Sequence, residues 1–181
     1  MSKWFNFYKD RTCNESYEEY FKKKYSPFIN YIKESIKPNY KVAELGCGTS
    51  LVTKLVHSPK ISFLVGDNDR MMLELTSSQL GNRKVMKKLI DIRKELDEKF
   101  HLIYSHGVLE HFDTPEVCKI ISQQLKASNH LVHYVPSAKY VKPSFGDERL
   151  LTPKQWKNSI GVPEIREFNN GYDLMLIWKN K

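Results

Sequence analysis

Apolar and polar residues follow one another in blocks along this chain, and the blocks predict strands and helices in turn. Short apolar runs bounded by turn residues are typical of buried strands, whereas apolar residues three and four positions apart are typical of helices. From residue 41 onward the two patterns alternate with short links, which indicates an α/β fold with a parallel sheet. The predicted strands are 41–46, 61–66, 84–89, 101–106, 130–136, 164–168 and 172–178. The predicted helices of this part are 50–57, 70–80, 92–99 and 114–127, with a further helix starting at Thr152.

The two ends of the chain add a hairpin and a helical segment. The last two strands are joined by Asn169-Asn170-Gly171, residues that favour a tight hairpin turn, so we expect an antiparallel closing pair. Before the first strand, the patterns of 14–25 and 26–36 predict two helices. Residues 1–8 are dense in aromatic side chains, which are costly to leave in water, and we expect them to pack down.

The first strand leads into a glycine turn, Gly46-Cys47-Gly48, which is followed by a helical pattern. Glycine suits this place because a tight turn requires positive φ and because a missing Cβ lets the backbone approach a ligand. Glu44 lies at the carboxyl end of the strand, where open α/β sheets bind their ligands. The second strand ends at Asp67, and an acid at that place accepts hydrogen bonds from ribose hydroxyls in nucleoside-binding folds. The pattern therefore predicts a nucleoside site, with a plain tight loop and a surface turn acid as the alternatives.

Composition restricts the classes of protein. At 181 residues, with 40% hydrophobic and 12% aromatic residues, the chain suits one globular domain with a proper core. No apolar run approaches the length of a membrane span, and the N-terminus lacks a signal-peptide core. The cysteines, Cys13, Cys47 and Cys118, have neither metal nor disulfide spacing, which favours a reducing cytoplasm and no metal site.

The chain is basic, with a formal net charge of +8. Such a balance fits nucleic acid, an acidic membrane or an anionic substrate. The lysines are spread along the chain and there is no arginine-rich arm, although arginine reads base edges best. We therefore interpret the charge as solvated lysine-rich faces and disfavour a nucleic-acid partner.

Four segments together resemble the class I S-adenosylmethionine (SAM) dependent methyltransferases, in the small-molecule, methyltransferase type 11-like branch. The segments are Glu44–Gly48, Val65–Asp69, Asp91-Ile92 and Val108–His111, and the resemblance extends from about residue 41 to the C-terminus. It implies a seven-stranded Rossmann-like sheet, parallel with an antiparallel last strand, and helices on both faces. It also implies SAM as the cofactor, S-adenosylhomocysteine (SAH) as the product, and methyl transfer to an O or N atom of a small molecule or metabolite.

The resemblance assigns cofactor contacts residue by residue. Gly46 and Gly48 admit the methionine part, Asp67 holds the ribose, and Asp91 takes the adenine amino group. The full set of expected cofactor-binding residues is Glu44, Gly46, Cys47, Gly48, Asp67, Asn68, Asp91, Ile92, Ser105 and His106. Within a single domain, 1–181, residues 1–40 are expected to form a helical lid and 137–160 a substrate-side insertion.

Several residues near the expected methyl group could act as a general base. Histidine titrates near neutral pH, so His106 and His111 are the catalytic candidates. Tyr134, Tyr140 and the Asp147/Glu148 pair are alternatives, and His106 could equally pack on the cofactor. The candidate substrate contacts are Tyr8, Tyr17, Tyr134, Tyr140 and Phe145, with core packing as the alternative for each aromatic ring.

Two other functions stay open. The charge of +8 suggests an RNA or other nucleic-acid methyltransferase. However, Ser105-His106-Gly107-Val108 does not match the Asn/Asp-Pro-Pro-aromatic tetrad of amino-group DNA methylases, and no cysteine follows a proline. The second alternative is a non-catalytic SAM-binding partner of another subunit. The sequence leaves open the methyl acceptor, the atom methylated and the oligomeric state.

Overall fold

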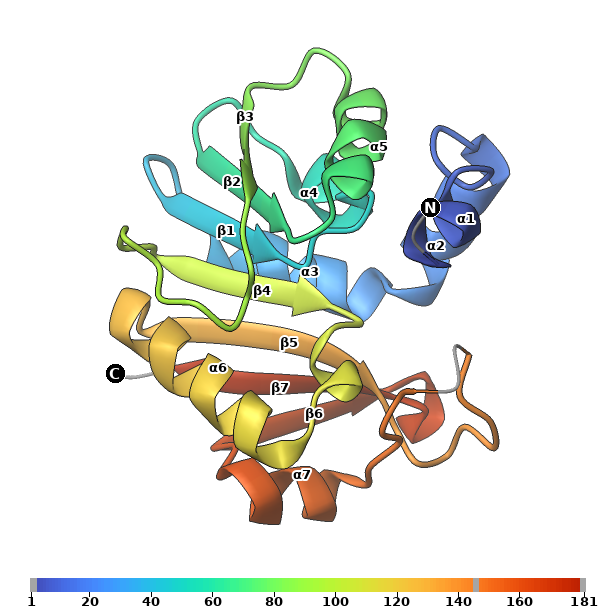
Figure 1. Ribbon diagram of the computed structural model, residues 1–181, viewed down its shortest axis with the longest axis vertical. Helices are drawn as coiled ribbons and strands as arrows, with labels where there is room; N and C mark the ends of the chain where they lie inside the picture. Colours follow the sequence, from blue (N-terminus) through green and yellow to red (C-terminus); the bar gives the residue numbers. More distant parts are fainter. Residues whose placement is uncertain (1–2, 145–146, 180–181) are drawn as a thin grey trace. The chain divides into compact units, whose positions relative to one another are not determined.

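The computed structural model describes residues 3–144 and 147–179 of the chain. They divide into two compact units, Met1–Ile92 and Arg93–Lys181. Figure 1 shows strands and helices alternating along each unit, as the sequence pattern predicts.

The first unit is built around three parallel strands. The apolar residues of its first two strands are buried, as expected where a parallel sheet is covered on its faces. The third strand differs, because only its first residue is partly buried. The helix after the second strand packs on the second and third strands. The strands are β1 (Lys41–Leu45), β2 (Ser62–Asp67) and β3 (Val85–Leu89), and the helices between them are α4 (Leu51–Val56) and α5 (Arg70–Leu80).

Three helices precede β1, namely α1 (Lys3–Tyr8), α2 (Glu15–Lys24) and α3 (Ser26–Ser35). The helix α3 buries three apolar side chains and contacts α4, whereas α1 contacts α5 and buries none of its residues completely. The aromatic rings of α1 are half-buried, so the described part of the opening segment packs down as expected.

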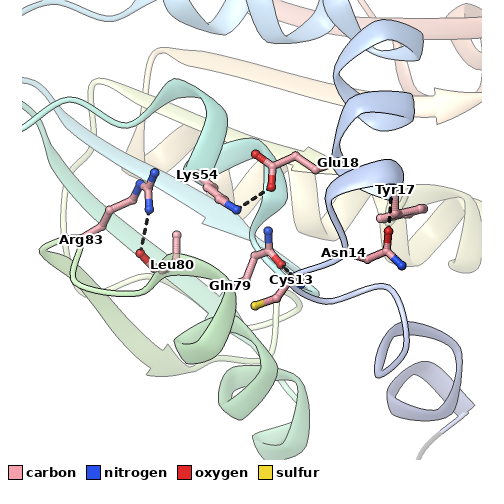
Figure 2. Close-up of polar contacts among 8 residues, drawn as sticks. All are labelled: Cys13, Asn14, Tyr17, Glu18, Lys54, Gln79, Leu80 and Arg83. Atoms are coloured by element: carbon pink, nitrogen blue, oxygen red, sulfur yellow. Dashed lines mark hydrogen bonds and ion pairs between the residues drawn. The ribbon is translucent and has the colours of Figure 1, made fainter.

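Two polar contacts tie this N-terminal segment to the helices that follow β1 and β2 (Figure 2). The Cys13 N–H donates a hydrogen bond of 2.6 Å to Gln79 Oε1 on α5, and Lys54 on α4 forms an ion pair of 2.5 Å with Glu18 on α2. Because Gln79 is buried, its bond is the better shielded of the two from competing water.

The second unit carries four strands, and its helices are well capped. Asp113 and Thr152 each form a capping box at the start of a helix that continues with proline, as the sequence suggests. The strands are β4 (Leu102–His106), β5 (His130–Pro136), β6 (Glu164–Phe168) and β7 (Asp173–Lys179). The helices are α6 (Thr114–Ala127), which packs on β5, and α7 (Pro153–Ile160), with a short 3-10 turn η1 (Leu109–His111) after β4.

The predicted closing hairpin is confirmed. Strand β7 runs antiparallel to both β5 and β6, and the turn η2 (Asn169–Gly171) joins β6 to β7. All three turn residues have positive φ, a conformation that asparagine and glycine tolerate best. The strand order of the described chain is β3-β2-β1-β4-β5-β7-β6, which confirms the predicted α/β class and seven-stranded sheet.

The predicted helix over 92–99 is wrong. These residues form turns and bends, without a helix. The segment after Ile92 is charged and has Leu96 as its sole apolar residue before Phe100, so a helix here would have no face to bury. Instead, Glu95 pairs with Lys126 of α6 at 2.6 Å.

Candidate functional site

The glycine turn after β1 is held by bonds to its neighbours. Gly46, Gly48 and Ser50 all have positive φ, between 53° and 66°, so the chain turns three times through the left-handed region within five residues. The Cys47 N–H donates to the Gly66 carbonyl at 2.9 Å, and the Thr76 hydroxyl donates to the Gly48 carbonyl at 2.6 Å. The turn is therefore fixed to β2 and α5 before any ligand is considered.

Asp67 links the end of β2 to this turn. Its Oδ2 accepts a hydrogen bond of 2.9 Å from the Gly48 N–H, and its Oδ1 accepts one of 3.0 Å from the Asp69 N–H. Burial raises the pKa of Asp67, and these backbone donors oppose the rise by favouring the carboxylate. Each carboxylate oxygen can accept a second hydrogen bond, so the oriented acid suits the ribose diol assigned to it. Asn68 beside it is exposed.

Glu44 is buried beneath the turn, with 2% of its surface exposed. Its Oε2 accepts hydrogen bonds from the Thr53 hydroxyl at 2.5 Å and the Thr53 N–H at 3.3 Å. Thr53 lies in the first turn of α4, whose N-cap residue Ser50 makes no side-chain capping bond. Glu44 therefore caps α4 from below, and burial raises its pKa to about 8. A cofactor contact through Glu44 stays a prediction.

The side chain of Cys47 also points into the first unit. It packs with Val65 and Leu80 in a buried cluster, and burial raises the pKa of its thiol. Its backbone is thus the part left to face a ligand.

The predicted adenine pair, Asp91 and Ile92, follows β3 at the end of the first unit. The preceding Ile90 N–H donates to the Asp67 carbonyl at 2.9 Å, which brings this segment to the same end of β2 as the Asp67 carboxylate. Ile92 is buried and Asp91 is partly buried. The first unit therefore gathers the glycine turn, Asp67 and the Asp91 segment in one place.

In the second unit, Ser105 and His106 end β4, with their side chains on opposite faces of the strand. Ser105 Oγ and His133 Nδ1 share a hydrogen bond of 2.8 Å, and both residues are completely buried. Burial lowers the pKa of His133 to about 3, so its ring is neutral. The Ser105 side chain is engaged by this bond, which leaves its backbone for the cofactor contact predicted from the sequence.

His106 lies on the ring of Tyr134, with 4.2 Å between ring centroids and 19° between planes. Tyr134 in turn donates to Asp173 Oδ1 at 2.8 Å, and Tyr140 donates to the same oxygen at 3.0 Å. Asp173 is completely buried, and its Oδ2 accepts a bond of 2.6 Å from Asn169. Two predicted substrate residues and one predicted base thus belong to one hydrogen-bonded and stacked group.

The role of Asp173 was not predicted from the sequence. The signal available was an acid at the start of an otherwise apolar closing strand, Tyr172–Trp178, but nothing local indicated that two tyrosines would donate to it.

The second base candidate, His111, is paired with an acid. Its Nδ1 and Asp147 Oδ1 lie 2.9 Å apart, so the insertion 137–160 brings one of the predicted Asp147/Glu148 carboxylates to the turn η1. When Nδ1–H donates to Asp147, Nε2 carries the lone pair that can accept a proton. This histidine–acid arrangement is the one that orients a general base.

Glu110, next to His111, is an unusual acid. It is 3% exposed, and Oε2 accepts no hydrogen bond within the described residues. Burial, aided by the nearby charges of Glu148 and Asp147, raises its pKa to about 8. The Arg149 N–H donates to the Glu110 carbonyl at 2.8 Å, which ties the insertion to η1 a second time.

The predicted substrate residues of the N-terminal segment lie in the first unit. Tyr17 packs against Tyr20 and Phe21, its backbone N–H is held by Asn14 at 3.0 Å (Figure 2), and burial raises its pKa. Tyr8 is half-buried in α1. Phe145 lies outside the described residues.

Within residues 3–144 and 147–179, no group of three or more His, Cys, Asp or Glu side chains is placed to hold a metal ion. No helix in that part of the chain is long and apolar enough to cross a membrane.

The sequence model of a protein family described as Methyltransferase domain matches residues 43–133, or 91 of the 181 residues. The chain belongs to this methyltransferase family. SAM is the cofactor of the family, so the resemblance seen in the four sequence segments is confirmed.

One curated relative is a malonyl-[acyl-carrier protein] O-methyltransferase of Anoxybacillus flavithermus. It is 30% identical to this methyltransferase chain over an alignment of 98 residues, and the match covers 51% of the chain and 38% of the relative. The chain thus spans about two fifths of the length of that protein.

Two solved structures resemble the methyltransferase chain. The PH0226 protein from Pyrococcus horikoshii OT3 has a TM-score of 0.77 at 12% identity, covering 100% of both chains. Magnesium protoporphyrin IX methyltransferase from Synechocystis PCC 6803, solved with bound SAH, has a TM-score of 0.68 at 12% identity, covering 88% of this chain and 83% of its own. At such identities the likeness shows the fold alone, which is the Rossmann-like class I methyltransferase fold.

Proposed function

We propose that this protein transfers a methyl group from SAM to an oxygen or nitrogen atom of a small molecule. The observation that carries the proposal is the Asp67 carboxylate, which is buried, oriented by the Gly48 and Asp69 N–H groups and joined to the glycine turn. This arrangement suits a nucleoside better than a plain surface turn would, because two fixed acceptor atoms face the same end of β1 and β2.

The residues of the first unit fit SAM as a bound group. Asp67 would hold the ribose hydroxyls, the backbone of the turn Gly46–Gly48 would admit the methionine part, and Asp91 would take the adenine amino group. When bound, SAM supplies a methyl group that its sulfonium already activates. The chain therefore has to position the acceptor and, for a hydroxyl or amine, remove its proton.

The pair His111–Asp147 is assigned to proton removal. Asp147 orients the ring through Nδ1, and Nε2 accepts the proton of the acceptor as the new bond to carbon forms. His106, stacked on Tyr134, forms a flat wall for the acceptor, and Asp173 keeps Tyr134 in place. The insertion, which supplies Asp147 and Tyr140, is the substrate-side part of the chain.

A second candidate acceptor is a carboxylate on an acyl group borne by a carrier protein, as the name of the Anoxybacillus relative states for that enzyme. A carboxylate is already deprotonated at neutral pH, so its methylation requires no base. The two candidates differ in one measurable respect. Loss of His111 should impair methylation of a hydroxyl or amine and leave methylation of a carboxylate nearly unchanged.

Calorimetric titration of SAM and SAH into the purified chain tests the proposal. We expect Asp67→Ala to weaken both ligands by about 100-fold, since two hydrogen bonds to a charged group contribute about 3 kcal/mol or more together. Asp67→Asn keeps one acceptor oxygen and should weaken them less. Glu74→Ala removes an exposed carboxylate of the same unit and serves as the matched control.

The outcomes separate the alternatives. If the intact chain binds neither SAM nor SAH, the proposal is wrong. If it binds both but methylates no hydroxyl, amine or carboxylate acceptor, it is a SAM-binding partner rather than an enzyme. Methylation of RNA alone would favour the nucleic-acid alternative.

A further inference from the structure

Strand β3 is an edge strand of the sheet, and most of its side chains are exposed. Within the described residues it pairs with β2 alone and ends the strand order. Apart from Val85, which is partly buried, its residues are exposed, and Met86 and Leu89 keep 57% and 55% of their surface in water. Central strands of the same sheet are nearly completely buried.

The backbone of β3 presents one row of groups to this edge. The Ile90 N–H points to β2, where it donates to Asp67, and groups two residues apart along a strand point the same way. The parallel register, with Leu89 opposite Asp67 and Val85 opposite Phe63, agrees with this direction. The N–H and C=O groups of Val85, Lys87 and Leu89 therefore point away from β2, toward the open edge.

The side chains at this edge carry charge of one sign. Residues 81–90 contain Arg83, Lys84, Lys87 and Lys88 and no acid, so a ten-residue segment supplies four positive charges, equal to half of the net +8. All four side chains are exposed. Arg83 Nη1 also donates to the carbonyl of Leu80 at 3.1 Å and so caps α5 (Figure 2).

The positive charge of β3 restricts which kind of chain can pair with its open edge. Lysines on an edge strand prevent pairing with a second copy of the same strand, because like charges would lie directly opposite one another. The same lysines attract an extended segment rich in Asp or Glu. Protein is favoured over RNA because bases stack on aromatic and arginine side chains, whereas Met86 and Leu89 are aliphatic and the single arginine of the segment is tied to α5.

We propose that the open edge of β3 binds an acidic, extended segment of a partner protein as an added strand. Backbone groups of Val85, Lys87 and Leu89 pair with the segment, Lys84 and Lys87 meet its carboxylates, and Met86 and Leu89 cover its apolar residues. The proposal is independent of the methyl-transfer reaction and of the SAM site.

The test uses a fluorescent peptide of about eight residues with alternating glutamate and valine, matched to one strand. A second peptide has the same side chains but N-methyl groups on alternate residues, so it keeps its charge and cannot pair as a strand. A single-stranded RNA of equal charge is the third probe. Affinity is measured by fluorescence anisotropy at low salt, and hydrogen exchange of the Lys87 and Leu89 amides is measured with and without peptide.

The variant Lys84→Glu/Lys87→Glu is compared with Lys22→Glu/Lys23→Glu, which changes the net charge equally on the exposed side of α2. We expect the β3 variant to bind the unmodified peptide at least about tenfold more weakly and the α2 variant to bind it nearly as the parent does. Exchange at Lys87 and Leu89 should slow on binding. If the β3 charge reversal disturbs folding, Lys84→Ala/Lys87→Ala gives the same comparison with a smaller charge change.

Four outcomes would overturn the proposal. They are no peptide binding by the parent chain, equal losses in the two charge variants, undiminished binding of the N-methylated peptide, and tighter binding of RNA than of peptide through the same lysines.

Discussion

The turns after β1 and after β4 are built alike and are used differently. Each leaves the carboxyl end of a parallel strand through a glycine at positive φ, Gly46 in one and Gly107 in the other. Each has a buried glutamate beside it, Glu44 in one and Glu110 in the other. Burial raises the pKa of both carboxyl groups to about 8. The difference lies in the partners of the two carboxyl groups.

Glu44 Oε2 accepts two hydrogen bonds from Thr53, whereas Glu110 Oε2 accepts none within the described residues. A buried acceptor without a donor costs about 1–3 kcal/mol of folding free energy. The Glu44 carboxyl avoids this cost through Thr53, whereas the Glu110 carboxyl bears it at Oε2. We infer that the β1 turn is a rigid binding element. We propose that the β4 turn, which also carries the His111–Asp147 pair, serves acid–base chemistry.

The largest expected effect is a loss of kcat without a loss of SAM affinity. His111→Gln should lower kcat for a hydroxyl or amine acceptor by about 10²–10⁴, the usual contribution of a general base, and leave SAM affinity unchanged. The exposed His101→Gln is the matched control, and steady-state kinetics with calorimetry give both quantities. A parallel loss of SAM affinity would show that the β4 turn is a binding element too.

The next effect concerns stability at the β1 turn. Glu44→Ala should lower the free energy of unfolding by about 1–3 kcal/mol, because Thr53 loses its acceptor in a buried place. Glu44→Gln has the shape of the protonated acid and keeps an acceptor oxygen, so it should cost much less at pH 7. Urea unfolding of the two variants measures the difference. Equal losses would mean that the carboxyl group itself, rather than its acceptor oxygen, supports the turn.

The last effect is a slope of stability with pH. A carboxyl group whose folded pKa is about 8, above its ordinary 4.5, keeps a proton in the folded state that the unfolded chain releases. Stability therefore falls as the pH rises from about 4.5 to 8, by up to about 1.4 kcal/mol per pH unit for each such group. Burial lowers the pKa of His133 to about 3 from its ordinary 6.5. His133 therefore makes stability rise with pH between about 3 and 6.5, and it adds no pH dependence above 6.5.

Unfolding between pH 6.5 and 8 isolates the two glutamates. Glu110→Gln and Glu44→Gln should each reduce the change of unfolding free energy with pH. In the double variant the unfolding free energy should be nearly independent of pH over this range. A slope that survives in the double variant would assign the pH dependence to other groups.

Much of the fold could be read from local pattern. The strands, the Asp113 and Thr152 caps and the Asn169–Gly171 hairpin follow from periodicity and turn chemistry, which neighbouring residues in the chain determine. The helix expected over 92–99 failed because charged residues suit a helix locally but leave it no apolar face to bury.

The sequence by itself determined the glycine turn, the acid Asp67 at the end of the second strand and the methyltransferase family. Only the tertiary structure decided that Thr53 would satisfy Glu44 while Glu110 lacks a donor for Oε2, that Ser105 would be engaged by His133, and that Asp147 would orient His111. It alone placed Asp173 between Tyr134 and Tyr140. The physical reason is that a hydrogen bond requires its atoms within about 3 Å. Packing of elements distant in sequence, rather than any local preference, sets which side chains come that close.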